Sequence, residues 1–115
     1  DQVTDATERF LVSEFVREAL FRRLRQEVPY STAVRVERFQ ESERCIEIDC
    51  QIFVERDSQK GIIIGKGGSM LKEVGTAARQ RVERLLGHKV FLRLHVKVVR
   101  RWADDAFHLR QLGYE

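Results

Sequence analysis

Long apolar runs are missing from this sequence. No stretch approaches the roughly 20 consecutive apolar residues that a membrane-spanning helix requires, and no signal-peptide pattern opens the chain. The 115 residues, of which 43% are hydrophobic, are enough for one domain around one core. We therefore expect a single soluble domain over residues 1–115.

Cysteine is scarce, and the two cysteines present cannot pair with each other. Cys45 and Cys50 lie five positions apart in one predicted strand, and an odd separation puts their side chains on opposite faces. A chain without a disulfide fits a reducing, cytoplasmic setting. The first residue is Asp1 rather than Met, so we also expect the chain to be part of a longer protein, or a processed one.

The usual loops for nucleotides and clusters for metals are also lacking. The glycine-rich stretch GIIIGKGGS, Gly61–Ser69, is one residue shorter than a Walker A loop and has Gly67 where that loop needs a hydroxyl. It also fails the spacing of a dinucleotide-binding loop, and no acidic residue follows about 20 positions later. His88, His95 and His108 have no ligand spacing with one another. We therefore expect no catalytic, cofactor or metal site.

Basic residues are concentrated in one block that begins beside this glycine-rich stretch. Residues 1–59 carry 9 Lys and Arg against 13 Asp and Glu, residues 60–101 carry 11 against 2, and residues 102–115 carry 1 against 3. The middle block thus has a net charge of +9, although the whole chain has only +3. Such a concentration favours a polyanionic partner, with a solvated basic surface as the alternative.

Hydrophobic periodicity predicts two long helices. The first covers residues 7–28, with Asp5 or Thr7 as its N-cap and Pro29 as its terminator. The second runs from Ser69 to Leu86 and stops at a glycine. The residues expected to face the core are Leu11, Phe15, Ala19, Leu20, Leu24 and Val28 in the first helix, and Met70, Leu71, Val74, Ala78, Val82 and Leu85 in the second.

Alternating patterns predict three strands in a mixed sheet. Residues 33–40 and 44–56 form an antiparallel hairpin, and residues 89–99 form a third strand that joins through a helical crossover, as a parallel strand must. The outer face of the second strand is acidic and those of the other two are basic, which puts the second strand in the centre. The expected fold class is α+β, in two layers, with strand order 1-2-3.

The stretch Gly65-Lys66-Gly67-Gly68 has the form G-x-x-G, with isoleucines before it and Leu71 after it. A plain turn is the alternative interpretation, but this pattern resembles the KH domain family, in which such a loop clamps the backbone of about four nucleotides. The resemblance implies the type II order α-β-β-α-α-β, with three helices packed on the sheet. It makes residues 61–64 a short helix capped by Asp57 or Ser58, whereas the residues alone predict a strand there.

The similarity extends over essentially the whole chain to the C-terminal KH domain of the Era family of bacterial GTPases. It is carried by VTDATERFLVSEFVREALFRRLRQEVPYSTAV, by RDSQKGIIIGKGGSMLKEVGTAARQRVERLLGHKVFLRLHVKVVRRW and by LRQLGY. The resemblance implies binding to small-subunit (16S) ribosomal RNA near its 3′ end during assembly of the 30S subunit, and a GTPase domain that these residues do not include. We also expect a monomer, because the amphipathic elements form a complete set, and peripheral membrane association of the full-length protein.

We expect single-stranded RNA to lie in an apolar groove lined by Ile62, Ile63 and Leu71, with its backbone held by Gly65 to Gly68. A KH fold that serves mainly as a protein-docking surface, on the ribosome or against its own GTPase domain, is the alternative function. Trp102 is interpreted as a packing residue rather than a base-stacking one, and Asp104-Asp105 as a helix cap rather than a catalytic pair. The predicted RNA-binding residues are Lys60, Ile62, Ile63, Gly65, Lys66, Gly67, Gly68, Ser69, Leu71 and Lys72.

Overall fold

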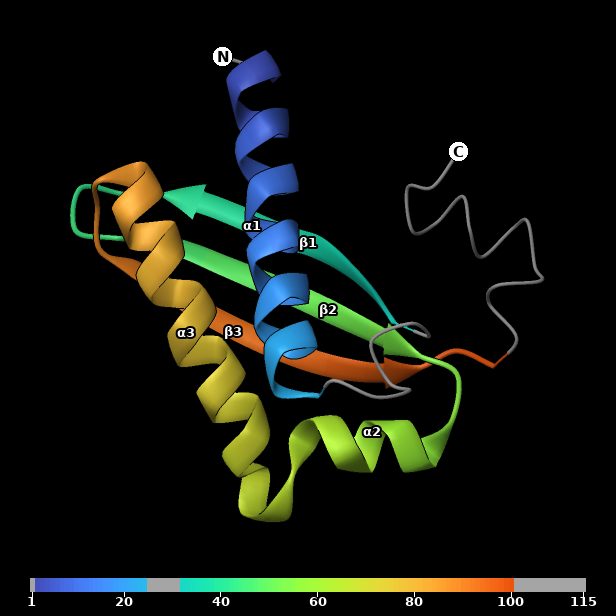
Figure 1. Cartoon of the computed structure of the whole chain (residues 1–115). Coiled ribbons are helices and arrows are strands. Elements are labelled where there is room, and N and C mark those ends of the chain that lie inside the picture. Colours follow the sequence, from blue (N-terminus) through green and yellow to red (C-terminus); the bar gives the residue numbers. More distant parts are fainter. Residues whose placement is uncertain (1, 25–31, 101–115) are drawn as a thin grey trace.

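The computed structural model describes residues 2–24 and 32–100, and the elements follow one another in the expected order α-β-β-α-α-β (Figure 1). Pro29, Trp102, the Asp104-Asp105 pair and His108 lie outside the described residues, as does any helical turn of the C-terminal tail. The elements are α1 Gln2–Arg23, β1 Ala33–Glu41, β2 Ile46–Val54, α2 Asp57–Ile64, the 3-10 turn η2 Lys66–Gly68, α3 Ser69–Leu86 and β3 Val90–Val98.

The sheet has the predicted strand order, with the acidic strand β2 in the centre. β1 pairs with β2 antiparallel, and β3 pairs with β2 parallel. The connection from β2 to β3 contains α2 and α3, because parallel neighbours cannot be joined by a tight turn. As Figure 1 shows, α1 and α3 both lie on the same face of the sheet.

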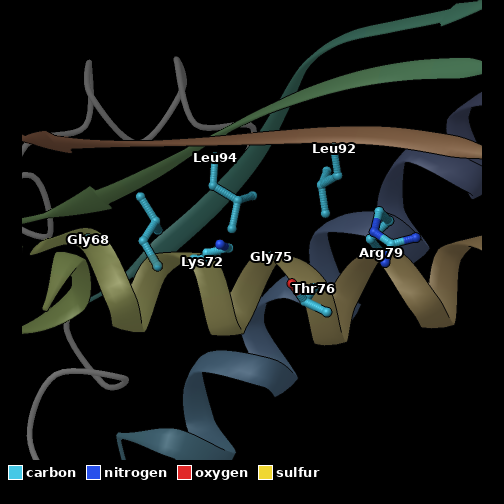
Figure 2. A pocket seen from close by; sticks show the side chains of 8 residues that line it. Gly68, Lys72, Gly75, Thr76, Arg79, Leu92 and Leu94 are labelled. Atoms are coloured by element: carbon cyan, nitrogen blue, oxygen red, sulfur yellow. The ribbon is translucent and has the colours of Figure 1, made fainter.

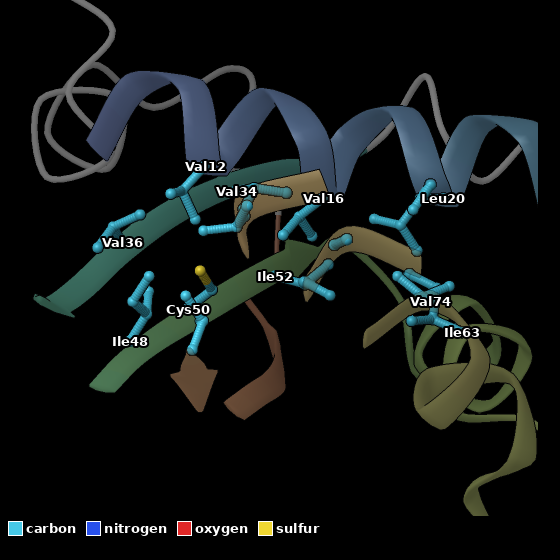
Figure 3. Close-up of a cluster of buried hydrophobic side chains, with 14 of the residues drawn as sticks. Val12, Val16, Leu20, Val34, Val36, Ile48, Cys50, Ile52, Ile63 and Val74 are labelled. Atoms are coloured by element: carbon cyan, nitrogen blue, oxygen red, sulfur yellow. The ribbon is translucent and has the colours of Figure 1, made fainter. Parts of the chain in front are cut away.

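The core lies between this face and the helices (Figure 3). The alternating pattern of β2 puts Ile46, Ile48, Cys50, Ile52 and Val54 on one face, and all five are buried, the last four at 0% exposure. Cys45 and Cys50 are both free thiols. Burial raises the pKa of the Cys50 thiol to about 12. This thiol therefore behaves as a small apolar core group rather than as a nucleophile.

The buried faces of the two long helices differ in part from the prediction. In α1 the fully buried side chains are Val12, Val16 and Leu20, while Phe15 packs at the edge of the core. In α3 the predicted central residues are buried, but Leu85 is 44% exposed and Leu86 packs on the core instead. Each error has the same cause, since apolar residues one position apart both fit a 3.6-residue period, and only packing selects between them.

Two helix boundaries also need correction. α1 already begins at Gln2, so neither Asp5 nor Thr7 is its N-cap. Residues 61–64 belong to α2 and not to a strand, as the family resemblance implied. The N-cap of α2 is Arg56, whose backbone N–H donates to Oε1 of Gln59 at 2.9 Å. This hydrogen bond at the start of the helix and the burial of Ile63 together override the β-propensity of the isoleucine triplet.

The opposite face of the sheet carries the predicted ladder of alternating charges. Glu47 accepts hydrogen bonds from Arg38 at 3.0 Å and from Arg93 at 3.3 Å, and Asp49 accepts one from Arg93 at 2.6 Å. The hydrogen bond from Arg38 is the main cause that lowers the pKa of Glu47, and the bond from Arg93 is the main cause that lowers the pKa of Asp49. This network ties the three strands together on the side away from the helices.

Candidate nucleic-acid interface

The glycine loop connects α2 to α3 through three residues with positive φ: Gly65 (76°), Gly67 (62°) and Gly68 (81°). Such values favour glycine. At Gly65 a side chain is also excluded by space, because a Cβ would lie 2.6 Å from Cβ and 2.8 Å from the backbone N of Met70. At Gly67 and Gly68 a Cβ would meet nothing within 4 Å. Gly65 is therefore required for the close packing of the loop against Met70, while Gly67 and Gly68 leave the outer surface of the loop without side chains.

The loop leads directly into the N-terminus of α3. Gly68 occupies the N-cap position, where no side-chain hydrogen bond caps the helix, and Ser69 is the first helical residue. The first N–H groups of a helix lack partners within the helix, and this end carries a partial positive charge. The backbone N–H groups of Gly68 and Ser69 already donate to the carbonyl oxygens of Gly65 and Lys66. An anionic oxygen such as that of a phosphate is therefore attracted here mainly by the partial positive charge of the helix end.

Three lysines surround the loop. Lys66 and Lys72 are exposed and Lys60 is half-buried. Within the part of the chain that the structure describes, none of the three forms an ion pair, and the two acidic residues of α3 are paired with arginines. The loop therefore presents positive charge that no neighbouring carboxylate neutralises.

An open groove of about 360 Å³ starts at the loop and runs between α3 and β3 (Figure 2). Leu92 and Leu94 point from β3 toward the helix, and polar and basic side chains of α3 line the other wall (Figure 2). Gly75 leaves room in this wall, because a Cβ there would lie 3.6 Å from Cδ1 of Leu94. The lining residues are Gly68, Leu71, Lys72, Gly75, Thr76, Arg79, Leu92 and Leu94.

The structure gathers most of the predicted site around the loop, but two of the predicted isoleucines do not line the groove. Of the residues expected to line the groove, Leu71 does so, and Gly68 and Lys72 line it as well. Ile63, however, is 0% exposed and packs in the core, so its side chain cannot form the floor of a groove. Ile62 is 50% exposed but does not line the groove between α3 and β3. Adjacent residues of a helix point about 100° apart, so Ile63 packs in the core while Ile62 stays exposed.

Sequence reasoning missed the far half of the groove. Thr76 and Arg79 follow Lys72 at helical spacing, so they lie on the same face of α3 and could have been found by continuing that face. Gly75 is a glycine inside a helix, which often marks a close approach or a binding site. Leu92 and Leu94 were expected to point inward, and they do, but at the edge strand they form the floor of a groove.

The far end of the groove is fixed by a carboxylate that bridges α3 and β3. Nη1 of Arg79 donates to Oε1 of Glu83 at 2.9 Å, and the backbone N–H of Val90 donates to Oε2 of Glu83 at 3.0 Å. The bond from Val90 is the main cause that lowers the pKa of Glu83. Glu83 thus stays ionised and holds both the start of β3 and the Arg79 side chain.

The described residues contain neither a cluster of metal ligands nor a membrane-spanning helix. Among residues 2–24 and 32–100, no group of three or more His, Cys, Asp and Glu side chains is placed to hold a metal ion. Nor does any helix in these two ranges have the length and apolar content needed to cross a membrane.

The sequence of this chain matches a known protein family and named relatives. The family described as KH domain matches residues 27–103. GTPase Era of Geobacter sp. (strain M21) is 56% identical, and that of Coxiella burnetii (strain Dugway 5J108-111) is 53% identical, each over the whole of this chain. The chain spans 39% of the length of each of these relatives.

Solved structures of Era share the fold. An Aquifex aeolicus Era variant bound to GDP and AlF4⁻ matches 92% of this chain with a TM-score of 0.86 and 41% identity, over 36% of its own length. An Era complex with MgGDPNP and nucleotides 1506–1542 of 16S ribosomal RNA matches 92% of this chain with a TM-score of 0.87 and 41% identity, again over 36% of its own length. On the family match, the shared fold and the glycine loop at the start of α3, this chain belongs to the KH domain family.

Proposed function

We propose that this chain is a single RNA-binding domain of an Era-like GTPase and binds single-stranded RNA, in particular 16S ribosomal RNA near its 3′ end. The main support is the joined geometry of loop and groove. Glycine backbone without side chains, a helix start without a side-chain cap and lysines that form no ion pair within residues 2–24 and 32–100 lie at one end of a groove with an apolar floor. Phosphates need N–H groups and positive charge, and bases need an apolar surface.

In this proposal the backbone of the strand lies on Gly65 to Gly68, and its bases extend along the floor formed by Leu71, Leu92 and Leu94. The named Era complex with 16S ribosomal RNA supports this choice of RNA. Binding to the 30S subunit in the cytoplasm, as a monomer, completes the proposal. We further infer that GTP binding and hydrolysis belong to a part of the whole protein outside these 115 residues.

A titration of the chain with a fluorescent RNA oligomer of the 16S 3′-end sequence tests the proposal. The double variant Lys66→Asp with Gly67→Asp places carboxylates against the phosphates, and we expect it to abolish binding. The fold should survive, because Lys66 and Gly67 are exposed and a Cβ at Gly67 meets nothing within 4 Å. The φ of Gly67 is also in the left-handed region that Asp tolerates better than most residues.

Two controls separate the loop from general electrostatics. The double variant Arg17→Asp with Ala6→Asp causes the same change in net charge, but on α1, which lies on the other side of α3 from the groove. It should weaken binding only slightly. Arg93→Ala lies on the outer face of the sheet and should also matter little. Parent-like binding by a folded loop variant would instead favour the protein-docking function.

A further inference from the structure

The two ends of the groove contact different parts of a bound strand. Gly68 and Arg79 lie 11 residues apart on the groove-facing side of α3, which corresponds to about 16 Å along the helix axis. A strand whose backbone is held at the loop therefore presents a different nucleotide at Arg79. The inference below rests on the proposed function, because it concerns which base that strand carries there.

Arg79 differs from the lysines of the interface because a hydrogen bond to Glu83 holds its guanidinium group in position. Its Nη1 is bonded to Glu83 at 2.9 Å, and Glu83 is itself bonded to the backbone of β3. The Arg79 side chain is 36% exposed, and a guanidinium has five N–H donors. One donor fixes the group, and the planar fork keeps others for a ligand in the groove.

This difference separates backbone contact from base recognition. Lys66 and Lys72 are exposed point charges that form no ion pair among the described residues, and charges of this kind contact phosphates of any sequence. A fixed guanidinium instead matches two adjacent acceptors on a base edge. Leu92 on β3 faces the same end of the groove as Arg79 (Figure 2), so an apolar surface for the base lies beside the donors.

We propose that Arg79 is a base-reading residue of this domain. It recognises a base that presents two adjacent acceptors, cytosine through O2 and N3 or guanine through O6 and N7, in preference to adenine or uracil. Adenine and uracil alternate donors and acceptors along these edges and cannot accept both arms of the fork. Glu83 is a positioning residue, which acts only by holding the Arg79 guanidinium.

The test compares octacytidine with octauridine, two single strands with pyrimidine bases of similar size, at one fixed salt concentration. The parent chain should bind octacytidine at least about fivefold more tightly. Arg79→Lys keeps the charge and removes the fork, so the ratio of the two Kd values should fall close to one. Lys72→Gln, a phosphate-contact control, should weaken both complexes equally and leave the ratio unchanged.

A second variant tests the positioning role. In Glu83→Gln the amide oxygen can still accept the N–H of Val90, but the side chain no longer holds the Arg79 guanidinium by charge. The cytosine preference should drop, while the thermal unfolding midpoint stays near that of the parent. Equal binding of both oligomers by the parent, or an unchanged ratio in Arg79→Lys, overturns this inference alone. Failure of the parent to bind either oligomer overturns the proposed function as well.

Discussion

Replacing Gly75 with alanine should make the domain more stable and a poorer RNA binder. Gly75 lies inside α3 with ordinary helical φ, and glycine in a helix costs about 0.5–1 kcal/mol relative to alanine. The new Cβ would lie 3.6 Å from Cδ1 of Leu94, a normal van der Waals distance. The variant should therefore gain about 0.5–1 kcal/mol, or roughly 4 °C in Tm at the upper end.

Binding should change in the opposite direction. The added methyl group projects from the wall of the groove between α3 and Leu94, where the proposed function places a base. An extra methyl in a fitted apolar site costs about 1–3 kcal/mol, which corresponds to at least about a fivefold increase in Kd.

Differential scanning calorimetry and an RNA titration on the same samples measure both effects. Gly61→Ala is the matched control, because Gly61 also lies inside a helix, a Cβ there meets nothing within 4 Å, and it does not line the groove. It should gain similar stability with parent-like RNA affinity. If Gly75→Ala gains stability and binds RNA as the parent does, bases do not lie on this floor.

Three further predictions concern the loop, the charge ladder and the binding of GTP. Gly65→Ala should lower the free energy of unfolding by about 1–3 kcal/mol or more, because its Cβ would overlap the Met70 backbone; chemical denaturation with an unchanged midpoint would contradict this. The folded-state pKa values of Glu47 and Asp49 lie below their ordinary values of 4.5 and 3.8, so the stability they add is present above about pH 4.5 and is lost as the pH falls. Asp49→Asn should therefore flatten the acid side of the profile of unfolding free energy against pH, and an identical slope in parent and variant would exclude the ladder as its cause. The 115-residue chain should neither bind nor hydrolyse GTP, and a binding signal in calorimetry would refute that.

The fold could be predicted from the sequence where the charge pattern and the hydrophobic period indicated the same arrangement. The acidic outer face of β2 predicted that this strand lies in the centre of the sheet. In the structure, Arg38 of β1 and Arg93 of β3 donate hydrogen bonds to its carboxylates. The predicted bounds of α3 match the observed ones, because its apolar period is clear and a glycine ends it. Where two readings fitted locally, as for the isoleucine triplet in α2, only tertiary packing decided, and it buried Ile63 alone among the three.

The candidate site was predicted at its glycine end and missed at its far end. Glycines beside lysines are visible as a motif, and Gly65 to Gly68 form the loop as expected. The groove combines α3 with a strand that begins only after the helix ends, so Arg79 and Leu92 become neighbours through the fold and not through spacing. The Glu83 bond to the backbone of β3 cannot be read from side-chain types at all.

The most direct measurement is an NMR titration of isotope-labelled chain with the 16S 3′-end oligomer, which maps amide shifts onto the structure. The account predicts that the largest changes occur from Gly65 to Leu71, continue to Arg79 along α3, and include Leu92 and Leu94 on β3. The outer face of the sheet around Arg93 should change little. Shifts that cluster on that outer face or on α1, without changes in the amides of the glycine loop, would contradict RNA binding at the loop and groove.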